Sequence, residues 1–317
     1  MADIIESTMP KDGNIVRLLN DFESEANGKS TITSPHEMLN RMIGGGFRRG
    51  LTSIVAGPPG NGKSFFAYNQ VLHMLLRNQK VKYLPLEYTA VNHIRRIMGV
   101  YVGSWGMIND TPEKAQERTD AFMKNSSMIF KFNEIEKNIL ENPTNIQLDE
   151  DGRPYIPSVD YNAIMEVVRH YSQTEDMIII DPITAIDPKK GDGKGYEQQE
   201  KFVKDISATA AYYKTHIMLI GHTVRRQKHN GKPTALTNDD IAGTIALARF
   251  TQYMLLVDYH DSRESSVENR SMMKTTVDHK RTMFIGKATY GCGTGQKIAF
   301  EFDHGPNLEE LGVIQND

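Results

Sequence analysis

The stretch TSIVAGPPGNGKSFFAYNQVLHMLL (52–76) decides the fold of this 317-residue chain. It begins as a strand, continues as GPPGNGKS (57–64), and ends as a helix with Phe65, Tyr68 and Leu72 on one face. The middle part matches G-x-x-x-x-G-K-[ST] without a gap. Between a strand and a helix, such a turn lets successive backbone N–H groups surround phosphate oxygens. A glycine-rich turn that matches by chance is the alternative, but the flanking strand and helix disfavour it.

The motif assigns a role to each part of this loop. We expect Lys63 to reach the β- and γ-phosphates of ATP, and the Ser64 hydroxyl to ligate Mg²⁺. The predicted cofactor-binding residues are the loop and the residue after it: Gly57, Pro58, Pro59, Gly60, Asn61, Gly62, Lys63, Ser64 and Phe65.

Two acidic residues end other apolar runs. Asp181 ends MIIID (177–181), and we expect it to bind Mg²⁺ directly or through water; otherwise it only terminates a strand. Glu87 ends VKYLPLE (81–87), the run that follows the loop helix. Placed beside the loop strand, it would point at the γ-phosphate and polarise an attacking water. The alternative for Glu87 is a glutamate favoured by a helix dipole.

Apolar runs alternate with helix-period segments over residues 31–303. This alternation predicts an α/β fold with a mostly parallel sheet flanked by helices. Several runs are too apolar for a solvated face, as expected of strands covered on both sides. The last two runs are close together and predict an antiparallel C-terminal edge. The expected strands are 52–57, 81–87, 127–132, 177–181, 217–222, 253–259, 282–288 and 298–303.

The remaining segments flank or interrupt this domain. Residues 1–30 are predicted to be an arm or linker helix, and residues 304–317 a C-terminal tail. Residues 133–159 read as a surface insertion, and the Gly/Lys-rich 187–196 as a mobile loop. The apolar residues of the arm fall at helical spacing: Ile15, Leu18, Leu19 and Phe22.

Composition limits the compartment and the partners. The net charge is −3 and the pI about 6.4, so nothing global indicates nucleic acid, although a ring with a few pore lysines could bind it. The single cysteine, Cys292, excludes an internal disulfide and fits a reducing cytosol. No apolar run approaches the ~20 residues of a membrane helix. We expect a soluble, cytoplasmic protein without a membrane partner, located in the bacterial host if phage-encoded.

Longer stretches resemble a known family. GGGFRRGLTSIVAGPPGNGKS (44–64) followed by KYLPLEYTAVNHIRRIMG (82–99) resembles the ATPase domain of DnaB-type replicative helicases. The stretch 217–260 is most similar to the phage primase-helicase and Twinkle branch. The resemblance covers about residues 31–303 and implies a RecA-like P-loop NTPase core. Residues 1–30 are too few for the N-terminal collar or primase of these helicases, so we expect them to dock on the next subunit of a ring.

The resemblance implies roles for further residues. His222, at a strand end, would sense the γ-phosphate, although such a histidine is often structural. Phe302 would lie against adenine, or else be a core residue of an edge strand. The family's Lys-x-Arg places an arginine finger in the neighbouring subunit, but here the finger position is Thr289. Lys287 is therefore the catalytic cation candidate, and Arg281 is a second one by proximity in sequence.

The loop that grips DNA in these helicases also departs from the family pattern. It reads Asp239-Asp240-Ile241-Ala242-Gly243-Thr244 where the helicases carry D-L-R-x-S-G. Two carboxylates facing phosphates would be repulsive. Other cations are candidates for DNA contact, or else ordinary solvated surface charges: Lys189, Lys190, Lys194, Arg225, Arg226 and Lys228.

Two functions remain open. The first is a hexameric, phage- or plasmid-type DNA helicase, or helicase-like motor, that acts on single-stranded DNA with other replication proteins as possible partners. The alternative is a RecA/KaiC-like regulatory or assembly ATPase without unwinding activity. The motif order favours the first, whereas Thr289 and the acidic loop favour the second. A binding protein without hydrolysis is disfavoured because Lys63, Ser64, Glu87 and Asp181 are all present.

Overall fold

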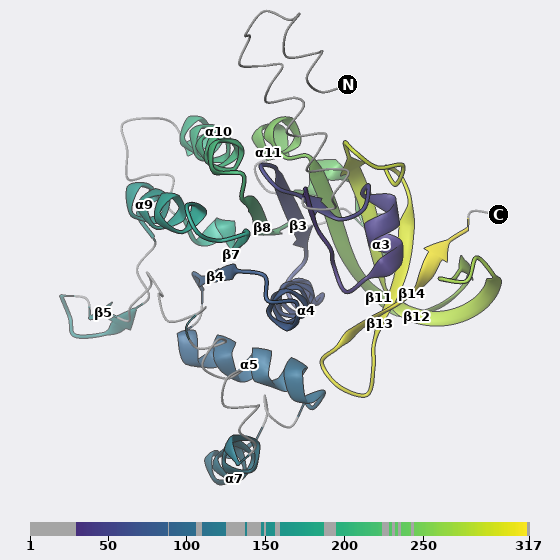
Figure 1. Cartoon of the computed structure of the whole chain (residues 1–317), viewed down its shortest axis with the longest axis horizontal. Helices are drawn as coiled ribbons and strands as arrows, with labels where there is room; N and C mark the ends of the chain where they lie inside the picture. The colour runs from purple at the N-terminus through teal and green to yellow at the C-terminus, as the bar shows by residue number, and fades with distance from the viewer. Residues whose placement is uncertain are drawn as a thin grey trace, which may run out of the picture.

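The structure is a computed structural model dominated by one eight-stranded sheet with helices on both faces (Figure 1). The residues that it describes are 30–87, 89–105, 110–124, 137, 147–148, 150–155, 159–186, 195–223, 228–229, 232–233, 236–241 and 244–315.

Five strands of this sheet run parallel. Three of them are buried along their whole length, as their apolar sequences predict. In spatial order the five are β11 (Tyr253–Glu268), β3 (Thr52–Gly57), β8 (His216–His222), β7 (Met177–Asp181) and β4 (Val81–Pro85).

The C-terminal strands are antiparallel. β12 (Lys274–Ala288) pairs with β11 and with β13 (Lys297–Phe302), and β13 pairs with β14 (Leu308–Ile314). β14 returns to β11 through the pair Val267↔Ile314. The four strands β11 to β14 therefore pair in a closed cycle rather than ending in an open edge.

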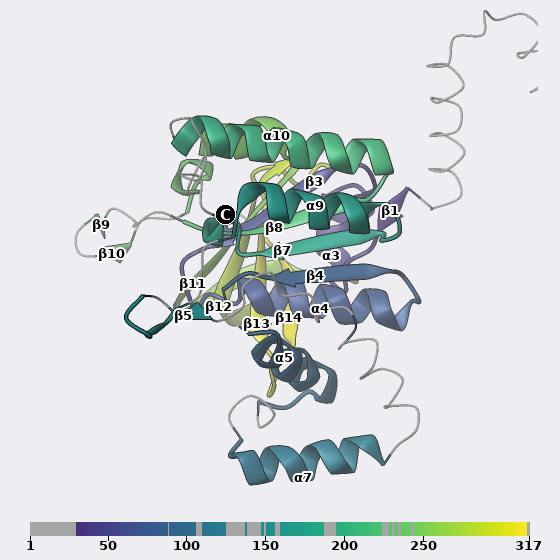
Figure 2. The same cartoon turned by 90° about the vertical axis from the view of Figure 1, so that its left-hand side faces the viewer.

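Two groups of helices cover the two faces of the sheet (Figure 2). One face carries α3 (Glu37–Met42), α4 (Lys63–Leu76) and α5 (Ala90–Val102). The other carries α9 (Tyr161–Ser172), α10 (Gly195–Tyr213) and α11 (Thr244–Phe250). α7 (Pro112–Met123) lies beyond α5, away from the sheet.

Short elements complete the described chain. They are β1 (Thr31–Ile32), β2 (Phe47–Arg48), β5 (Gln147–Leu148), β6 (Pro154–Tyr155), β9 (Lys228–His229), β10 (Lys232–Pro233) and the 3₁₀ helices η1 (Ile183–Ala185) and η2 (Asn238–Asp240).

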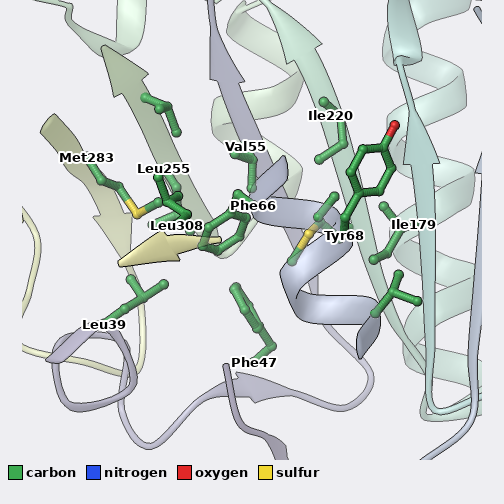
Figure 3. Close-up of a cluster of buried hydrophobic side chains, with 14 of the residues drawn as sticks. Leu39, Phe47, Val55, Phe66, Tyr68, Ile179, Ile220, Leu255, Met283 and Leu308 are labelled. Atoms are coloured by element: carbon green, nitrogen blue, oxygen red, sulfur yellow. The ribbon is translucent and has the colours of Figure 1, made fainter. Parts of the chain in front are cut away.

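The alternation of side chains along β3 divides the core between the two faces. Val55 packs into the cluster on the α4 face, with Phe66 and Leu255 among its members (Figure 3). Ile54 and Ala56 belong to the cluster under α9 to α11. β3, the strand that leads into the loop 57–64, therefore packs against a separate hydrophobic core on each face of the sheet.

The α/β fold, the mostly parallel sheet and the antiparallel C-terminal strands are confirmed. Two expectations are wrong. β4 does not lie beside β3, because β8 and β7 lie between them. The more apolar β7 and β8 occupy the interior, whereas β4 contains Lys82, whose ammonium lies over the Tyr171 ring of α9. The predicted tail is also wrong for Leu308–Ile314, which forms β14 inside the sheet.

Several expectations lie outside the described residues. They concern the arm 1–29 with Ile15, Leu18, Leu19 and Phe22, the run 127–132, most of 133–159, the loop 187–194, and Lys189, Lys190, Lys194, Arg225, Arg226, Ala242 and Gly243. Within the described helices, none is long and apolar enough to cross a membrane.

Candidate functional site

The loop between β3 and α4 has the backbone that its glycines permit. Gly60 (φ 80°) and Gly62 (φ 100°) lie in the left-handed region, which glycine adopts without steric cost. Gly62 is the N-cap of α4 and has no side chain to accept from the first amides of the helix. A helix N-terminus left open in this way is suited to an anion.

Gly57 is required for a different reason. A Cβ at this position would lie 2.2 Å from the carbonyl oxygen of Val257 on β11. The Asn61 side chain donates to that same carbonyl at 3.2 Å. Close packing against β11 therefore fixes where the loop begins.

Lys63 folds back over the loop, and its Nζ donates to the Pro58 carbonyl at 2.8 Å. Burial lowers the pKa of Lys63 to about 8, although Asp181 and Glu87 act in the opposite direction. Burial outweighs the two carboxylates because the ammonium loses its hydration. A bound polyphosphate would favour the charged ammonium.

Asp181 ends β7 directly beside the loop. Burial raises the pKa of its carboxyl, while hydrogen bonds from Tyr83 and Ser64 and the charge of Lys63 oppose this. The site therefore brings together a hydroxyl and a carboxylate, and Mg²⁺ prefers oxygen ligands of this kind. The residues present fit the expected cation.

Glu87 and His222 meet at the same edge of the sheet. His222 pairs with Gly57 across β8 and β3, and its Nε2 lies 4.0 Å from Glu87 Oε2. The Leu86 amide donates to the Asp181 carbonyl at 2.7 Å, which ties the segment after β4 to β7. Burial, then the charge of Lys63, lowers the pKa of His222, so its imidazole is neutral at pH 7.

An aromatic cluster lies on the other side of the loop. Phe302 is half-buried, and its ring lies 3.4 Å from the place that a Cβ on Gly62 would take. It makes edge contacts with Phe65 at 5.5 Å and with Trp105 at 5.2 Å between ring centroids. The Arg281 guanidinium lies 4.1 Å from the Phe302 centroid. The sequence predicts roles for the two phenylalanines, but no motif marks Trp105.

Lys287 does not join this cluster. Its Nζ donates to the carbonyls of Ala248 and Thr251, at 2.8 and 2.7 Å, where α11 ends. The Thr289 hydroxyl donates to the Gln252 carbonyl at 3.1 Å. In this chain, both side chains hold the C-terminal end of α11 against the end of β12.

Local structure explains one of the two aspartates in the acidic loop 239–244. The Asp240 carboxylate accepts from the Thr237 amide at 2.7 Å and forms a capping box at η2. Asp240 is therefore bound within its own turn.

Tyr83 is a further residue of the site that no motif marks. Its hydroxyl is buried in β4 and donates to Asp181 Oδ2. A tyrosine inside an apolar run was the available signal, since a buried hydroxyl needs a partner.

The fold and the site define the P-loop NTPase class, and comparisons with known proteins agree. Residues 22–228 match a family model described as an AAA domain, so the chain belongs to the AAA domain family. A search of curated proteins gave no match.

Solved structures share the fold. A DnaB-like replicative helicase, described with its interactions with primase, has 18% identity and a TM-score of 0.61 over 92% of this chain. This chain spans 65% of that helicase. A second structure, described as an ATPase domain, has 20% identity and a TM-score of 0.61, covering 95% of this chain and 100% of that domain. The RadB recombinase has 14% identity and a TM-score of 0.51, covering 89% and 100% respectively. At these identities the likeness establishes the RecA-like fold found in DnaB-type ATPase domains.

Proposed function

We propose that this protein hydrolyses ATP with Mg²⁺ at the loop 57–64. Lys63 binds the β- and γ-phosphates, while Ser64 and Asp181 hold the metal, which neutralises developing phosphate charge when bound. One observation carries this proposal. The loop and the ends of β4, β7 and β8 bring their polar side chains together at one edge of the sheet. Ligands bind outside the carboxyl ends of strands in folds of this kind.

Glu87 is the proposed general base. Its side chain is 47% exposed, so a water can reach the carboxylate, and His222 Nε2 lies 4.0 Å from it. The neutral His222 imidazole can donate to a γ-phosphate oxygen and so report whether that phosphate is present. Glu87 would then orient and deprotonate the attacking water.

The base of ATP is proposed to lie against Phe302, beside Phe65 and Trp105. The support is that this cluster adjoins Gly62, at the end of the loop opposite Glu87. The alternative is that Phe302 only completes the core, against which it also packs.

The nucleic acid on which the protein acts and its oligomeric state are proposed from the resemblance to DnaB-type helicases. In this proposal a ring, most simply a hexamer, acts on single-stranded DNA with other replication proteins, a primase being one candidate. Residues 1–30 would dock on the neighbouring subunit, outside the ATPase domain, which begins at about residue 31 and includes β14. The alternative is a regulatory or assembly ATPase, which Thr289 and the use of Lys287 within its own subunit favour.

The experiment is the ATPase rate of the purified protein with and without single-stranded DNA. A motor on DNA is expected to be stimulated by single strands more than by duplex of equal nucleotide concentration. Lys63→Ala, which removes the phosphate clamp, is the matched control for contaminating activity. An ATPase rate that single-stranded DNA does not change would support the regulatory ATPase and reject the helicase.

A further inference from the structure

A buried chain of polar side chains runs from α5 to the proposed metal carboxylate. His93 Nδ1 of α5 lies 2.7 Å from the Tyr68 hydroxyl of α4. The Tyr68 ring packs on the Tyr83 ring of β4, with 5.4 Å between ring centroids, and the Tyr83 hydroxyl donates to Asp181 of β7. All four residues are buried. We call this set, His93, Tyr68, Tyr83 and Asp181, the tyrosine relay.

The direction of the hydrogen bond between Tyr83 and Asp181 is fixed by the carboxylate. The Asp181 carboxylate can only accept, so Tyr83 gives its single proton to it. Burial raises the pKa of both tyrosines and lowers that of His93 to about 3, so all three remain neutral.

The relay also touches the element that carries Glu87. α5 begins at Ala90, three residues after Glu87, and its His93 begins the relay. α5 is therefore joined to the site by two routes: by the backbone to Glu87, and to Asp181 by the packed rings of the relay and the hydrogen bond of Tyr83. Rings of the three side chains pack on one another, with centroids 5.3 to 5.9 Å apart, so the relay is also sterically constrained.

We propose that Tyr83 is a positioning residue for the metal ligand Asp181, and that Tyr68 and His93 tie this position to α5. Tyr83 holds Oδ2 of the carboxylate, which would leave the other oxygen to bind a cation. The relay thus sets the geometry of the metal ligand together with that of Glu87. This inference rests on the proposed function.

Tyr83→Phe is the direct test, because it keeps the ring and removes the donor. Binding of ATP is measured by titration calorimetry with Mg²⁺ and with EDTA. Partners of metal ligands typically change metal affinity by about 10- to 100-fold. We expect the Mg²⁺ concentration needed for half-maximal tight binding to rise about tenfold, while ATP binding in EDTA stays unchanged.

Two further variants separate positioning from packing. Tyr68→Phe is expected to shift the Mg²⁺ requirement in the same direction but less, because Tyr83 keeps its bond to Asp181. Tyr253→Phe, at another fully buried tyrosine of the same sheet, is expected to leave it unchanged. An unchanged Mg²⁺ requirement in folded Tyr83→Phe, or an equal loss of binding in EDTA, would overturn the proposal.

Failure of the proposed function gives a different result. If wild-type protein binds no ATP even with Mg²⁺, the nucleotide site itself is refuted and the relay has no ligand to position. If wild type binds ATP with Mg²⁺ and Tyr83→Phe does so equally well, only the relay is refuted.

Discussion

At the scale of single residues, Phe302 shows how a side chain can have two roles. It packs against the core on one side and adjoins Gly62 of the loop on the other. Its strand neighbour Phe300 is 1% exposed and belongs wholly to the core. Phe300 is therefore a suitable control for a substitution of Phe302.

Phe302→Ala is expected to weaken ATP binding by about tenfold, because base–aromatic stacking contributes roughly 1–3 kcal/mol. Calorimetric titration with ATP gives the Kd, and thermal melting gives the stability. Phe300→Ala, in contrast, should mainly destabilise the fold. A Phe302→Ala protein that melts like Phe300→Ala but keeps its Kd would assign Phe302 to the core alone.

Local and distant residues of the site differ in how well sequence predicts them. The loop 57–64 could be found because its chemistry depends on neighbours along the chain. The partners of Tyr83 and Trp105 could not be predicted, because they come from elements far away in sequence. Lys287 was assigned by resemblance, and only its carbonyl partners on α11 show a second use for it.

At the scale of elements, the attachment of α11 to β12 depends on Lys287. A cation at a helix C-terminus binds the last carbonyls and is favoured by the dipole. Lys287 makes two such bonds, and burial lowers the pKa of its ammonium.

Lys287→Met is expected to lower the free energy of unfolding by about 1–2 kcal/mol, since hydrogen bonds to charged groups are worth roughly 1.5–3 kcal/mol before discounting for solvent. Urea unfolding measures the change. Lys297→Met, at a half-buried lysine of β13, is the control and should stay within about 0.5 kcal/mol. Unchanged stability with lost ATPase activity would instead assign Lys287 to a neighbouring subunit's site.

Strand order and strand number were the least predictable features of the fold. The run 81–87 follows the loop helix directly, yet β4 lies beyond β8 and β7 from β3. The sequence of β14, LEELGVI, contains two glutamates and does not by itself predict a strand. The Glu310 carboxylate accepts from the Met38 and Leu39 amides, both at 2.8 Å, at the start of α3. Only this long-range contact explains an acidic residue inside the strand.

At the scale of the whole molecule, buried histidines connect stability to pH. His36 stacks on Phe66 and His216 bonds to Ser53, and both are fully buried. Burial, with help from His73 and Arg270, lowers the pKa of His36 to about 3. Burial lowers the pKa of His216 to about 4, against its bond to a backbone carbonyl.

The sign of the effect follows from these shifts. Both histidines are neutral in the fold, whereas unfolded histidine takes up a proton below about pH 6.5. The contribution of these two histidines to the free energy of unfolding is therefore fully present above about pH 6.5. It is lost as the pH falls toward their pKa values in the folded protein. At about pH 5 each is expected to cost about 2 kcal/mol of stability.

Urea unfolding at about pH 7.5 and about pH 5 measures this loss. His36→Phe keeps an aromatic ring against Phe66 and should reduce the pH dependence by roughly half the two-histidine effect. His304→Gln, at an exposed position, should leave it unchanged. Equal stability of the wild type at the two pH values would contradict the assignment of neutral buried histidines.

The central claim, that the molecule is an ATPase whose base is Glu87, is tested most directly by the turnover of Glu87→Gln with ATP binding followed in parallel. The account predicts that Glu87→Gln binds Mg·ATP as well as wild type but turns it over about 10²-fold more slowly or worse. Lys63→Ala should abolish hydrolysis, which shows that the activity belongs to this protein. Equal turnover of wild type and Glu87→Gln, with Lys63→Ala inactive, would contradict the account and remove Glu87 from the mechanism.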